Sequence, residues 1–134
     1  MKTPLYFCAL LLMALIALPA SADSLSVRLV SVSNDGNATD PGLSDVAATL
    51  RQLPFSNYKI VSAKLVALPA NGTVNLGAGL AVSLNGAADN LKVDVLRNGK
   101  SIYSSTLGLQ PGTPFSNVIR SGPSQYLLIL VLQQ

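Results

Sequence analysis

The sequence predicts a mostly β protein: a small antiparallel β-sandwich or partly closed barrel of seven to eight strands with one short N-terminal helix. Three observations support this fold class. Apolar and polar residues alternate with a period of two in several segments, and the turn-forming dipeptide Asn-Gly occurs three times. Turn signals separate the segments at roughly the 8–12-residue spacing of small sandwiches and barrels. The 134 residues are enough for one small domain and not for two.

Residues 1–22 have the pattern of a secretory signal peptide. Lys2 provides the positive start, residues 5–18 form an apolar stretch, and an Ala-Ser-Ala motif ends at Ala22. Cleavage there would make Asp23 the first residue of the mature chain. We therefore expect an exported protein, either periplasmic or secreted.

The alternative for this segment is an uncleaved membrane anchor. Residues 5–18 reach roughly 21 Å as a helix, which is short of the ~30 Å hydrocarbon core of a bilayer. We therefore expect no stable membrane span after cleavage. Cys8, the single cysteine, lies inside this stretch, so residues 23–134 cannot form a disulfide and depend on an apolar core.

Residues 23–52 are expected to form one strand and one helix. Leu25, Val27 and Leu29 alternate with polar residues, as in a strand. After a polar loop the period changes, and apolar residues recur at helical spacing over residues 43–52 until Pro54 ends the helix. We expect this helix to cover one open end of the β structure.

Residues 53–134 are expected to form a β-meander, completing a single β-rich domain over 23–134. Asn71-Gly72, Asn85-Gly86 and Asn98-Gly99 mark three turns, because Asn-Gly tolerates the positive φ angles of a type I′ hairpin. At Asn98-Gly99, a two-residue loop would pair Arg97 with Lys100 and Val95 with Ile102.

The C-terminal segment 126–132 is apolar at every position. A strand with this composition is normally covered on both faces. We therefore expect it in the centre of a sheet.

Composition excludes several kinds of chemistry. The chain has no histidine and no glutamate, so it cannot build a Ser-His-Asp triad or an imidazole zinc site. The formal net charge of +3 is small, and the basic residues are scattered along the chain, which argues against nucleic-acid binding. The sequence predicts no catalytic, cofactor-binding or metal-binding residues.

Three weaker motifs have simpler interpretations. The loop 35–40 has oxygen-bearing side chains at alternating positions but departs from a calcium loop, so we expect its last Asp or a neighbour to cap the helix. Gly77-Ala78-Gly79 leads into a strand, so it predicts a bend rather than a dinucleotide site. Ser62 and Lys64 share one face of a strand, which leaves a Ser/Lys hydrolase as a remote alternative.

Four aromatic residues are the best candidates for a binding surface. Tyr58 and Tyr103 lie on expected strands among polar neighbours, and Phe55 and Phe115 precede strands. Aromatic residues at strand ends can form a binding edge. The alternative is that each covers the rim of a small core.

From Leu53 onward the chain resembles a loosely defined group of small exported β-rich proteins of Gram-negative bacteria. The resemblance rests on the segment 53–61 after a short helix, the hairpin 93–100, the stretch 106–109 and the apolar C-terminal strand. It implies a periplasmic or envelope-associated β domain. No catalytic or binding residues follow from it.

These observations predict a non-enzymatic exported β-domain that acts by protein–protein contact in the cell envelope, as an accessory to a secretion, pilus or surface assembly. Its partner would be an envelope protein that uses a sheet edge for strand addition. The alternative is a small-molecule or glycan-binding module that uses the four aromatic residues.

Overall fold

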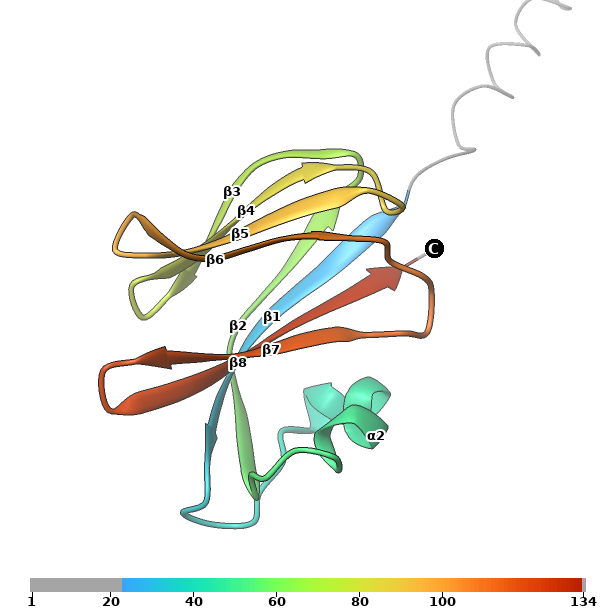
Figure 1. Cartoon of the computed structure of the whole chain (residues 1–134). Helices are drawn as coiled ribbons and strands as arrows, with labels where there is room; N and C mark the ends of the chain where they lie inside the picture. Colours follow the sequence, from blue (N-terminus) through green and yellow to red (C-terminus); the bar gives the residue numbers. More distant parts are fainter. Residues whose placement is uncertain (1–22, 134) are drawn as a thin grey trace, which may run out of the picture.

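A computed structural model of the chain describes residues 23–133 (Figure 1). The expected signal peptide, including Ala22 at its cleavage site, lies outside this range. The described residues form two four-stranded antiparallel sheets. Sheet A contains, in spatial order, β2 (Asn57–Ala67), β1 (Ser24–Ser33), β8 (Ser124–Gln133) and β7 (Phe115–Ser121). Sheet B contains β3 (Ala70–Gly77), β4 (Leu80–Gly86), β5 (Leu91–Arg97) and β6 (Lys100–Leu107).

The two sheets pack face to face as a small β-sandwich and do not close into a barrel (Figure 1). This confirms the sandwich among the two expected architectures. The main core lies between the sheets. It is built from alternate residues of their inner faces, among them Leu25, Val27, Leu29, Leu84, Leu91, Val93, Leu128 and Leu130.

The expectation of one continuous meander over residues 53–134 is wrong. Strands β3 to β6 form a meander and β7 pairs with β8, but β2 does not pair with β3, β6 does not pair with β7, and β1 lies between β2 and β8. The first and last strands are apolar on both faces and are therefore most stable in the centre of a sheet. That non-local pairing cannot be read from turn signals. The expected central place of the 126–132 strand is confirmed.

A short helical segment forms a third layer, on the outer face of sheet A (Figure 1). It consists of a 3-10 helix, η1 (Pro41–Val46), followed by the single turn α2 (Ala47–Leu50), rather than one helix over 43–52. Its buried residues Leu43, Val46 and Leu50 still follow the expected helical spacing.

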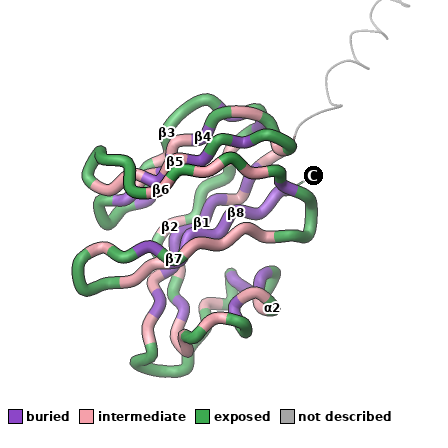
Figure 2. Tube along the Cα trace, viewed as in Figure 1, coloured by how far each residue is buried: buried purple, intermediate pink, exposed green. Residues whose placement is uncertain are grey.

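The outer face of sheet A presents a second apolar cluster to this segment. From β1 and β8 come Val30, Val32, Leu127, Ile129 and Val131. The helix thus covers a sheet face and not an open end of the sandwich. The central strands of sheet A are buried on both sides as a result (Figure 2).

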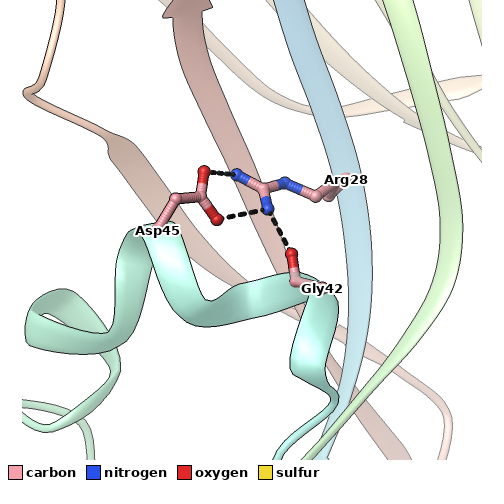
Figure 3. Close-up of polar contacts among 3 residues, drawn as sticks. All are labelled: Arg28, Gly42 and Asp45. Carbon is pink, nitrogen blue, oxygen red and sulfur yellow. Dashed lines mark hydrogen bonds and ion pairs between the residues drawn. The ribbon is translucent and has the colours of Figure 1, made fainter.

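Arg28 fastens the helical segment to the sheet (Figure 3). Its side chain leaves the outer face of β1 and is only 8% exposed. The two terminal nitrogens donate to both carboxylate oxygens of Asp45 at 2.8 Å, and Nη1 also donates to the carbonyl oxygen of Gly42 at 2.9 Å. A bidentate pair of this kind fixes geometry as well as charge. The Nε atom of Arg28 has no partner among the described residues.

The hairpin at Asn98-Gly99 is confirmed, with φ angles of 52° and 82°. Its register differs from the expectation beyond the first two pairs. Arg97 does pair with Lys100, but Val95 pairs with Tyr103, because a β-bulge leaves Ile102 as an extra residue. An inserted residue shifts every later pair by one, so the strict alternation assumed for this hairpin fails there.

The other two Asn-Gly pairs do not form hairpin turns. Asn71-Gly72 lies inside β3, and the turn that joins β3 to β4 is formed by Ala78-Gly79, the bend expected at 77–79. Gly86 ends β4 with a φ angle of 121°, and a Cβ atom there would overlap the carbonyl oxygen of Asn90. Glycine is required at this position by that close approach.

Candidate functional site

The structure separates the four candidate aromatic residues into two pairs. Phe55 and Tyr58 lie together beside the helical segment, with their ring centroids 6.4 Å apart and their planes at 88°. Tyr103 and Phe115 are half-buried and pack against the main core, on β6 and β7. These four residues therefore do not form a single aromatic surface.

Tyr58 is buried, with 5% of its surface exposed, so the expectation that its polar neighbours mark an exposed ring for binding is wrong. Tyr58 pairs with Val32 on the outer face of sheet A, and the helical segment packs over that face. The residues on either side of Tyr58 in the sequence point away from this covered face, so they can be polar. Burial raises the pKa of the Tyr58 phenol above its usual value.

Beside these two rings lies an open groove with a volume of about 550 Å³. The end of the helical segment forms one wall and the loop before it forms the other. Its lining residues are Asn37, Thr39, Ala47, Leu50, Arg51, Leu53, Phe55, Ser56 and Tyr58. This volume is in the range of small-molecule sites.

Tyr58 holds the walls of the groove together. Its hydroxyl donates to the carbonyl oxygens of Leu50 at 3.0 Å and Phe55 at 3.1 Å. Its backbone N–H donates to the carbonyl of Ala38 at 2.8 Å, and its carbonyl accepts from the N–H of Asp40 at 3.0 Å. The loop on one side and the helix end on the other are thus fixed by one residue.

Sequence reasoning missed most of the groove. Leu50 and Arg51 fall in the helix expected over residues 43–52, and Leu53 falls in the segment expected to follow it. Leu50 and Leu53 are three residues apart, so the apolar helical spacing continues past the last turn. This continued spacing is the feature of the sequence from which an apolar wall could have been predicted.

The edges of the sheets are the second candidate site, because an unpaired strand edge can bind another strand. Three of the four edge strands contain a β-bulge. The extra residues are Val61 in β2, Leu76 in β3 and Ile102 in β6. Bulges are one of the devices that prevent edge-to-edge pairing.

The β7 edge differs from the other three. Its register with β8 runs without a shift from Phe115 to Ser121. It contains no proline, its single charged residue is Arg120, and Val118 on it is 40% exposed. Among the four edges, β7 is the one that presents an unshifted row of backbone groups.

The β2 edge carries more exposed apolar surface than β7, at Val61 and Leu65. However, Lys59 and Lys64 lie on the same strand, and lysine is a common edge protector. The loop residues Ala38 and Asp40 also bond to the backbone of Tyr58, so one end of this edge is covered. The exposed side chain of Leu65 is therefore not enough to leave the β2 edge free for pairing with another strand.

The weaker motifs have structural explanations. The carboxylate of Asp40 accepts from the N–H of Gly42 at 3.0 Å, which is the helix cap expected at the end of the 35–40 loop. Within residues 23–133, no group of three or more His, Cys, Asp or Glu side chains is placed to hold a metal ion. Ser62 and Lys64 lie on β2 with no hydrogen bond between their side chains among the described residues.

We found no family model, no curated protein and no solved structure that matches this chain. Over residues 23–133, none of the helices has the length and apolar character needed to cross a membrane.

Proposed function

We propose that this protein is an exported, non-enzymatic β-domain that acts by protein–protein contact in the cell envelope. The β7 edge accepts a strand from its partner, which is a larger envelope protein of a secretion, pilus or surface assembly. The observation that supports this proposal most directly is the uninterrupted register of β7, the one edge among residues 23–133 without a bulge.

The hydrogen-bonding groups of β7 suit this role. Ser121 and Ser124 flank a two-residue turn, so the ladder alternation directs the backbone groups of Ser116, Val118 and Arg120 away from β8. The guanidinium of Arg97 donates to the carbonyl of Arg120 at 2.7 Å, in agreement with this assignment. Ser116 and Val118 are left to bond an added strand.

Co-isolation from the native host tests the proposal. The tagged protein is crosslinked in cells, purified and analysed by mass spectrometry. We compare the wild type with the double variant Ser116→Lys/Val118→Lys. A matched control, Ser104→Lys/Thr106→Lys, places the same charges on the exposed face of the β6 edge. We expect one abundant envelope partner, lost only in the β7 variant.

Two results would contradict the proposal. One is recovery of the wild-type protein without a partner, and the other is a β7 variant that keeps its partner. Thermal unfolding of each variant shows whether a loss of binding reflects a loss of folding. Sequencing the N-terminus of the same sample tests cleavage between Ala22 and Asp23.

A further inference from the structure

We infer that the groove beside Phe55 is a binding site for a small amphipathic carboxylate, a ligand with an apolar body and one negative charge. This site is independent of the β7 edge. The inference rests on three properties of the groove: its apolar floor, its single cation and its fixed shape.

The floor of the groove accepts an apolar body. Leu50, Leu53 and Phe55 supply aliphatic and aromatic surface. The ring of Tyr58 adds to it, while the proton of its hydroxyl is already shared between the carbonyl oxygens of Leu50 and Phe55, so the hydroxyl offers no hydrogen-bond donor to a ligand. An apolar ligand body therefore gains from burial here without leaving the hydroxyl unpaired.

The charge of the lining selects for an anion. Arg51 is the single charged residue that lines the groove, and no carboxylate is among the lining residues. Among the described residues, the Arg51 guanidinium makes no salt bridge and no side-chain hydrogen bond. Asp40 is next in sequence to the opposite wall, and its carboxylate accepts a hydrogen bond from the N–H of Gly42. A guanidinium and a carboxylate form paired hydrogen bonds.

Hydrogen bonds within the chain fix the shape of the groove. In addition to the bonds of Tyr58, the hydroxyl of Ser56 donates to the carbonyl of Gly36 at 2.6 Å. The N–H of Ser56 donates to the carbonyl of Ser33 at 3.1 Å. Because the walls are already ordered, binding costs little conformational entropy in the protein.

Two ligands of the same shape test the inference. We titrate the 15N-labelled exported protein with 2-naphthoate and with neutral 2-naphthamide and follow the backbone amides by NMR. Shifts are expected in residues 37–39 and 50–58, and naphthoate should bind more tightly by a factor of up to about five, the upper end of the range for an exposed ion pair.

Variants separate the two contributions. Arg51→Gln should remove the preference for naphthoate and leave naphthamide binding unchanged. Phe55→Ala should weaken both ligands. Lys92→Gln, which removes an exposed cation from the outer face of β5, should change neither. A naphthoate preference that survives in Arg51→Gln would overturn the inference. So would shifts scattered over the surface, or no shifts at millimolar ligand.

Discussion

The central strands of sheet A and sheet B are buried in different ways. In β8 the six residues from Leu127 to Leu132 are all buried. In β5, buried Leu91 and Val93 alternate with exposed Lys92 and half-buried Asp94. Sheet B has one covered face, whereas sheet A has the sandwich core on one face and the helical segment on the other.

This difference shows that a short helical layer can determine the composition of a sheet. The helical segment is brief, but it allows β8 to be apolar at consecutive positions and also covers Val30 and Val32 of β1. Sheet A is therefore a scaffold held from both sides, and β7 is presented at its edge. The same segment builds the groove on the outer side of that scaffold.

Truncation of neighbouring residues should give the largest contrast between the sheets. In sheet A, Leu128→Ala and Ile129→Ala each remove a fully buried side chain, and each should lower the free energy of unfolding by about 2–5 kcal/mol. In sheet B, Leu91→Ala should cost a similar amount, whereas Lys92→Ala should change it by less than about 0.5 kcal/mol. Urea unfolding of the four variants measures these values. A cost for Ile129→Ala as small as that for Lys92→Ala would mean that the outer face is not covered.

Removal of the Asp45 charge should have a smaller effect. Breaking a fully buried ion pair costs about 3–5 kcal/mol, but the side chain of Asp45 is 49% exposed. We therefore expect Asp45→Asn to lower the free energy of unfolding by about 1–2 kcal/mol, since Arg28 stays buried with a weaker acceptor. Asp89→Asn, at an exposed loop position, is the matched control and should be neutral. Equal free energies of unfolding for the two variants would show that the pair of Arg28 and Asp45 does not hold the helical segment on the sheet.

Acid should weaken the same contact. The hydrogen bond from Arg28 holds the pKa of the Asp45 carboxyl below its usual value of 3.8. The stabilisation is therefore fully present above that value and is lost as the pH falls through the lower pKa of the folded state. Stability measured from pH 6 downward should fall less steeply below pH 4 in Asp45→Asn than in the wild type. Parallel curves would contradict the assignment.

The smallest effect is expected at a single hydroxyl. Tyr58→Phe removes the donor that binds the carbonyls of Leu50 and Phe55, and should cost about 1 kcal/mol. Tyr103→Phe is the control, because the Tyr103 hydroxyl makes no hydrogen bond within residues 23–133. Its unfolding midpoint in urea should stay at the wild-type value. If both variants unfold alike, the hydroxyl of Tyr58 does not hold the groove.

Much of the fold follows from local pattern in the sequence. The alternation in β1, the Asn98-Gly99 hairpin and the fully apolar β8 each identify a strand or a turn from a few neighbouring residues. The order of strands in sheet A depends on contacts between the two ends of the chain. It also depends on which faces the helical segment covers, which no local pattern encodes.

The candidate site was harder to predict for the same reason. Tyr58 has polar neighbours, and only the return of residues 41–50 over the sheet buries its ring. The bulge at Ile102 likewise could not be predicted from the sequence. Val95 and Ile102 are both apolar, so pairing them directly agreed with the alternation pattern. Phe55 was among the residues predicted to bind a ligand. Arg51 and Leu53 line the groove only because of the direction that the chain takes after α2.

Site-specific photocrosslinking in the native host tests the central claim most directly. A photoreactive phenylalanine analogue replaces Val118 on β7 in one variant and Thr106 on β6 in another. We predict a single covalent adduct with an envelope protein from position 118 and none from position 106. An adduct from position 106 alone, or none from either edge, would contradict the assignment of β7 as the recognition edge.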